Sequence, residues 1–99
     1  MAISTPTRFR TNALYPPGDC LREELAARGM TQVALAKAMG QPLQTVNAVI
    51  RGKKSITADI ALQLERVLGI EAEFWLNLET HYQLTLARRL QEQRDTPAL

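Results

Sequence analysis

The sequence predicts an all-α fold of five helices joined by short connections. Apolar residues recur three or four positions apart in five successive stretches, which is the spacing of one face of a helix. Most of these stretches begin after a residue that caps helices and end at a glycine. No two neighbouring stretches have the character of paired strands. A chain of 99 residues has the length of one domain with a single modest core. We place the helices at about 20–28, 32–39, 42–51, 58–68 and 71–93.

Residues that favour helix starts and stops support these ranges. Asp19 is expected to cap the first helix, and Thr31 and Thr57 the second and the fourth. Pro42 suits the first position of the third helix, where its missing N–H costs nothing. The glycines that end the first four helices are Gly29, Gly40, Gly52 and Gly69. The residues expected on the inward faces of these helices are Leu21, Leu25, Val33, Leu35, Ala36, Met39, Val46, Val49, Ile50, Ile60, Leu64, Val67 and Leu68.

The chain divides into an arm, a domain and a tail. Residues 1–16 contain two prolines and three threonines without a periodic apolar pattern, so we expect a flexible N-terminal arm. Residues 17–93 form the helical domain, and residues 94–99 form a short tail. The arm could become ordered on a partner, but a loose end is the simpler interpretation.

Composition excludes several classes of protein. The apolar runs are too short to span a membrane, and the N-terminus lacks a secretory apolar segment. One cysteine, Cys20, and one histidine, His81, cannot assemble a Cys/His zinc site, and a cytoplasmic location suits the lone thiol. We find no nucleophile–base pair, phosphate-binding loop or metal cluster, so we expect neither an enzyme nor a bound cofactor. We expect Cys20 to be a half-buried helix residue and His81 to be a packing or surface residue.

Charge is unevenly distributed along the chain. Residues 1–54 carry eight Lys or Arg against three acidic residues, a net charge of +5. Residues 55–99 carry four against seven, a net charge of −3. The asymmetry indicates an anionic partner for the first half. On this count alone, charge scattered for solubility explains the numbers equally well.

Residues 32–52, "QVALAKAMGQPLQTVNAVIRG", have the pattern of a helix-turn-helix. Two steeply crossing helices need a small residue at their contact, which Ala36 supplies, and a tight link that accepts positive φ, which Gly40 supplies. Val46 and Val49 would anchor the second helix to the first. An ordinary αα-hairpin is the alternative, but it requires neither the alanine nor the glycine at these positions.

A helix-turn-helix that binds DNA places its second helix in the major groove. The outward side chains of that helix would then read base edges, the two amides through adenine and the two apolar residues through thymine methyl groups. Polar and basic residues around it would contact phosphates, which makes binding sensitive to salt. For Leu43 core packing is an equal alternative, and for the three cations the alternative is a solvated loop. The expected base-reading residues are Leu43, Gln44, Asn47 and Ala48, and the expected phosphate contacts are Thr31, Gln32, Thr45, Arg51, Lys53, Lys54 and Ser55.

Over residues 16–86 the chain resembles the HigA-type antitoxins, a branch of the lambda-repressor-like (XRE) helix-turn-helix family. The segments that carry the resemblance are "PGDCLREEL", "VNAVIRGKKSITADIALQLERVLG" and "EFWLNLETHYQL". The resemblance implies a lambda-repressor-like fold and a homodimer that binds a palindromic operator in double-stranded DNA and represses its own operon. It also implies a type II toxin–antitoxin system in which a small RNA-cleaving toxin is the second partner.

The sequence departs from this family at a few positions. Gln41 follows the turn glycine, where the family usually has an apolar residue. Leu43 and Gln44 stand where the family often has arginine or another polar residue, so the operator sequence cannot be transferred. Some relatives fuse the module to a metallopeptidase, but this sequence has no H-E-x-x-H motif.

The last helix carries more apolar residues than one buried stripe needs. We expect Phe74 and Leu78 to pack beneath the first and fourth helices, and Trp75, Tyr82 and Leu86 to form a second face. An additional apolar face on a small domain indicates an interface. We therefore predict a two-fold dimer built by this helix together with the fourth, with Trp75, Leu78, Tyr82 and Leu86 at the interface.

Two alternative functions remain open at this point. One is a stand-alone XRE-type regulator without a toxin. The other is a protein-interaction module in which DNA binding is vestigial.

Overall fold

The computed structural model describes residues 14–95, apart from the side chain of Asp95. Most of the predicted arm (1–16) and tail (94–99) lies outside the described residues. Within residues 14–95 the chain forms five helices and no strand, which confirms the predicted all-α class. The helices are α2 (Pro17–Arg28), α3 (Gln32–Met39), α4 (Leu43–Ile50), α5 (Ala58–Leu68) and α6 (Ala72–Asp95).

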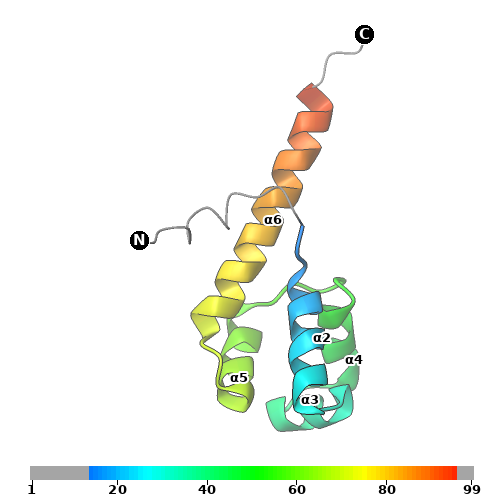
Figure 1. Ribbon diagram of the computed structural model, residues 1–99, viewed down its shortest axis with the longest axis vertical. Helices are drawn as coiled ribbons and strands as arrows, with labels where there is room; N and C mark the ends of the chain where they lie inside the picture. Colours follow the sequence, from blue (N-terminus) through cyan, green and yellow to red (C-terminus); the bar gives the residue numbers. More distant parts are fainter. Residues whose placement is uncertain (1–13, 96–99) are drawn as a thin grey trace.

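The four shorter helices pack together, and the long α6 extends beyond them (Figure 1). The first half of α6 lies against α5 and α2, while its second half extends away from the rest of the domain. None of the described helices combines the length and the apolar character that crossing a bilayer requires.

Local signals placed both ends of α3 and α5 and the end of α2 correctly, whereas α6 begins one residue and ends two residues later than predicted. The Thr31 hydroxyl accepts a hydrogen bond from the Ala34 amide at 3.0 Å, and Thr57 caps α5 in the same way. The prediction of Asp19 as the N-cap was wrong, because the cap is Pro16 and α2 begins at Pro17, three residues earlier than predicted. A proline already has the helical φ, so it starts the helix, and Asp19 instead pairs with Arg22 at 2.9 Å in the first turns.

α4 is one residue shorter at each end than predicted. Pro42 is the N-cap, with an extended backbone at ψ 149°, and Leu43 is the first helical residue. At the other end Arg51 is the C-cap and Gly52 follows with a left-handed backbone at φ 76°. The third predicted helix therefore lies in the expected place, although its two ends were assigned wrongly.

The core lies among all five helices. The prediction that Val33 belongs to the core was wrong, since its side chain is 48% exposed. It lies across the helix from Leu35 and Met39, which face inward. The buried apolar residues are Leu21, Leu25, Leu35, Ala36, Met39, Val46, Val49, Ile50, Ile56, Ile60, Ala61, Leu64, Leu68, Ala72 and Trp75.

The inward face of α6 is shifted by one position along the helix from the prediction, so that Trp75 and Phe74 exchange their expected places. Trp75 is completely buried within the single chain, so it cannot belong to a dimer surface. Phe74, expected inside, is 44% exposed and touches the Trp75 ring edge-on. Ala72 and Trp75 are three residues apart and share the buried side of α6. Phe74, one position before Trp75, points about 100° away from it and therefore outward.

Loss of the α5 cap should cost a moderate amount of stability. The Thr57 hydroxyl accepts from the Ile60 amide at 3.4 Å. We expect Thr57→Ala to lower the free energy of unfolding by about 1 kcal/mol, because this amide loses its partner. Urea unfolding measures the change. Thr57→Ser keeps the oxygen and is the matched control, so equal stability of the alanine and serine variants would contradict the prediction.

Candidate nucleic-acid interface

α3 and α4 form the predicted helix-turn-helix. Gly40 links them in a left-handed conformation, at φ 77°, that other residues adopt at a cost. Ala36 is 3% exposed where the two helices meet, and Val46 and Val49 are buried beneath α4. Gln41, the departure from the family pattern, donates from its side chain to the Gln63 side chain of α5 at 2.8 Å. The polar residue therefore ties the turn to α5 instead of packing there as an apolar one would.

The outer side of α4 carries the predicted base-reading residues. Leu43 is 43% exposed, and Gln44 is exposed beside it in the first turn. Asn47 and Ala48, one turn later, are half-buried. Leu43 is therefore a surface residue in this chain and not part of the core.

Two predicted contact residues bind each other. The Asn47 amide donates from Nδ2 to Oε1 of Gln32 at 3.2 Å, which joins α4 to the start of α3. The contact leaves the Gln32 amide nitrogen and the Asn47 amide oxygen available to a ligand. Neighbouring Thr31 uses its oxygen as the helix cap, but its hydroxyl hydrogen can still be donated.

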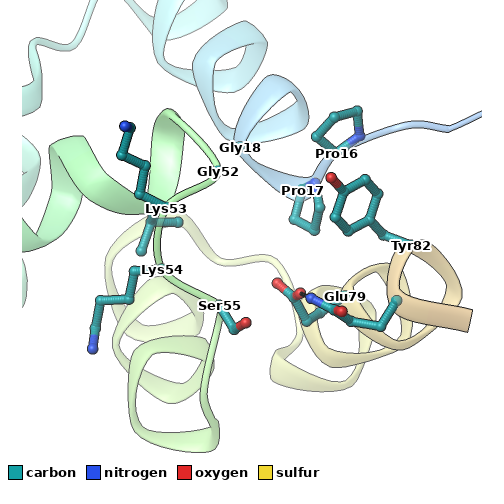
Figure 2. A pocket seen from close by; sticks show the side chains of 11 residues that line it. Pro16, Pro17, Gly18, Gly52, Lys53, Lys54, Ser55, Glu79 and Tyr82 are labelled. Carbon is teal, nitrogen blue, oxygen red and sulfur yellow. Dashed lines mark hydrogen bonds between the residues drawn. The ribbon is translucent and has the colours of Figure 1, made fainter. Parts of the chain in front are cut away.

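A basic loop, residues 51–55, follows α4. Its beginning is fixed because the amides of Lys53 and Lys54 both donate to the Ala48 carbonyl, at 2.8 and 3.2 Å. Arg51, Lys53, Lys54 and Ser55 are all exposed, and no described carboxylate forms an ion pair with the three cations. Figure 2 shows the side chains of Lys53 and Lys54 on the side of the loop away from α6.

The electrostatics of this region favour an anionic partner. Residues 31–55 contain no Asp or Glu and carry four cations: Lys37, Arg51, Lys53 and Lys54. Opposing carboxylates therefore do not weaken the positive potential from within the segment. Thr45, also predicted to contact phosphate, is half-buried in the first turn of α4.

Two arginines that the sequence analysis missed hold the helix-turn-helix from outside. Arg22 of α2 donates to the Ile50 carbonyl at the end of α4 at 3.4 Å. Arg66 of α5 donates to the Ala38 and Met39 carbonyls at the end of α3, at 3.1 and 3.4 Å. A cation at a helix C-terminus satisfies free carbonyls and the negative end of the helix dipole. These contacts span about 28 residues of sequence, so no local pattern signals them.

Cys20 is a half-buried free thiol in α2. Burial raises the pKa of the Cys20 thiol, so it stays protonated at neutral pH and behaves as a small apolar side chain. Residues 14–95 contain no group of three potential metal ligands.

Part of the predicted dimer face remains available on α6. Leu78, Tyr82 and Leu86 are half-buried in the single chain, so each keeps surface for a partner. Leu84 and Leu90, on the same helix, are 46% and 53% exposed.

Known proteins match this chain over most of its length. The helix-turn-helix family model matches residues 21–75. The virulence-associated protein I of Dichelobacter nodosus is 43% identical over 88 residues, which cover 88% of this chain and 82% of that protein. The antitoxin HigA-1 of Vibrio cholerae is 43% identical over 63 residues, which cover 63% of this chain and 59% of the relative.

Solved structures agree with these matches. The structure of the Pseudomonas aeruginosa antitoxin HigA with the higBA promoter superposes with a TM-score of 0.77 at 33% identity, and the match covers 88% of this chain and 99% of that chain. A HigA-family antidote protein from Coxiella burnetii gives a TM-score of 0.74 at 35% identity, covering 86% and 97%. Sequence and fold thus agree from the helix-turn-helix to the long last helix, and the chain belongs to the HigA-type antitoxins of the XRE helix-turn-helix family.

Proposed function

We propose that this chain is a sequence-specific DNA-binding repressor and the antitoxin of a HigBA-type toxin–antitoxin system. In this proposal it represses its own operon and neutralises an RNA-cleaving toxin. The observation that carries the DNA-binding part is the exposed outer side of α4, with Leu43 and Gln44 open to solvent next to a basic loop whose cations pair with no carboxylate among the described residues. The solved relatives bound to a promoter or operator support the same interpretation.

A gel shift tests the DNA-binding part. The probe is the promoter fragment directly upstream of the gene, and an unrelated fragment of equal length is the control. We expect specific retardation that weakens steeply as salt rises, because phosphate contacts release counterions. Equal affinity for both fragments would contradict sequence-specific repression and favour an interaction module with vestigial DNA binding.

Gln44 should contribute to base recognition. Its exposed amide lies in the first turn of α4, and an amide pairs with adenine through two hydrogen bonds. We expect Gln44→Ala to lower affinity for the cognate fragment by roughly tenfold or more, which is the scale of one lost base contact. Affinity for unrelated DNA should not change, since alanine leaves the phosphate contacts in place. Fluorescence anisotropy with both fragments measures the two constants, and a parallel loss on both would refute the assignment to a base.

A two-fold dimer would bring two α4 helices to neighbouring half-sites. The half-buried Leu86 on α6 tests this. We expect Leu86→Asp to convert a dimer to a monomer in sedimentation equilibrium, because two carboxylates would be buried against each other at the axis. Val33→Asp is the matched control, since Val33 is 48% exposed on α3, outside the helices expected at the interface. Dissociation by the Val33 variant but not by the Leu86 variant would place the interface elsewhere.

The toxin part depends on the neighbouring gene. A small basic protein encoded beside this one, toxic alone and silenced by co-expression, would support the antitoxin. Its absence would favour the stand-alone regulator, which uses the same DNA-binding surface.

A further inference from the structure

The basic loop is fastened to α6 by one carboxylate, that of Glu79. Its Oε1 accepts the Ile56 amide hydrogen at 2.9 Å, and Ile56 directly follows Ser55. Its Oε2 accepts from the Gln83 side chain at 2.7 Å, one helical turn further along α6. Both oxygens of this half-buried carboxylate are therefore occupied, one by the loop and one by its own helix.

The loop has room to move where Glu79 holds it. A cavity of about 90 Å³ separates the loop from α6 and from the start of α2. Residues Gly52 to Ser55 form one wall, and Glu79, Tyr82 and Gln83 form another (Figure 2). Because no described side chain fills this space, packing within the described part of the chain does not by itself support the inner side of the loop. The Glu79 contact and the buried Ile56 side chain hold the downstream end, as Ala48 holds the upstream end.

We propose that Glu79 is a positioning residue for DNA binding, which fixes the basic loop so that Lys53 and Lys54 meet phosphates. This inference rests on the proposed function. It assigns an acidic residue on α6 a favourable role in binding a polyanion, although it touches no DNA itself. A hydrogen bond to a charged acceptor is stronger than a neutral one, which suits a tie that must hold a loop beside an open space.

Electrostatics and positioning predict opposite results for the same substitution. A carboxylate near phosphates repels them, so removal of its charge would by itself strengthen DNA binding. If Glu79 holds the loop, Glu79→Ala instead weakens binding. We expect about a tenfold loss of operator affinity. The dependence of log K on log salt should become shallower by about 2 to 4 units, as one or two phosphate contacts are lost in each protomer of a dimer.

Three variants make the test specific. Glu79→Gln removes the charge but keeps one oxygen that accepts from the Ile56 amide, so it should keep most of the affinity that Glu79→Ala loses, although the neutral hydrogen bond is weaker. Glu73→Ala makes the same change in charge at an exposed position near the start of α6 and should not reduce affinity. Gln83→Ala removes an exposed partner that orients the carboxylate, so it should weaken binding two- to threefold without endangering the fold.

The measurements are operator affinity against salt for each variant, and hydrogen exchange of the Ile56 amide by NMR. Faster exchange of that amide in Glu79→Ala, together with weaker and less salt-dependent binding, supports the proposal. Unchanged or tighter binding by Glu79→Ala, or an equal loss in Glu79→Gln, overturns it. If Glu79→Ala is too unstable to assay, Gln83→Ala decides the question. Affinity of Gln83→Ala equal to that of the unmodified chain would then overturn the proposal. If the unmodified chain itself fails to bind its promoter, the proposed function falls and this inference with it.

Discussion

Simultaneous replacement of Arg51, Lys53 and Lys54 with alanine is expected to weaken operator binding by at least about a hundredfold at moderate salt. All three side chains are exposed at the end of α4, and no described acidic residue pairs with them. If each neutralises one phosphate in each protomer of a dimer, six contacts are lost. The slope of log K against log salt should then be about 5 units shallower than that of the unmodified chain.

Fluorescence anisotropy at several salt concentrations measures both quantities. The matched control replaces Arg88, Arg89 and Arg94 with alanine, which removes the same charge from the protruding half of α6. A purely long-range effect of net charge would weaken both triple variants alike, whereas phosphate contacts predict a selective loss in the loop variant. Operator binding of unmodified strength by the loop variant would disprove the assignment of these residues.

Replacement of Gly18 should have the largest effect on stability. A Cβ at this position would lie 2.3 Å from the Ile50 carbonyl oxygen and 2.5 Å from that of Val49. Both atoms belong to the backbone of α4, so no side chain can move aside. We expect Gly18→Ala to push α2 away from α4 and to lower the free energy of unfolding by about 3 kcal/mol, at the upper end of overpacking costs.

Gly29→Ala is the matched control for this substitution. Gly29 has a positive φ of 65°, but a Cβ there meets nothing within 4 Å. Its expected cost is about 1 kcal/mol, from the left-handed conformation alone. Chemical denaturation of both variants separates the close contact from backbone strain. If Gly18→Ala were no less stable than Gly29→Ala, the two helices would have to separate easily at this contact.

Local interactions explain why so much of this fold is predictable. A cap such as Thr31 or Thr57 bonds an amide only three residues away, and a glycine such as Gly40 acts through its own φ. The small Ala36 and the anchors Val46 and Val49 stand at the sequence spacings that two crossing helices require. Such features lie within a few residues of one another, so the order of the helices and the position of the helix-turn-helix follow from adjacent residues.

The directions of side chains and the contacts between residues far apart in the sequence could be determined only from the tertiary structure. α6 has apolar residues on more than one side, so only packing against α2 and α5 decides that Trp75 points inward and Phe74 outward. No neighbouring residue in the sequence signals the role of Gly18, which is to let α4 approach α2 closely. Glu79 reaches Ile56 across 23 positions. Hydrophobic burial has no preferred direction and hydrogen bonds depend on distance in space, so residues far apart in the chain acquire these roles only when the helices come together.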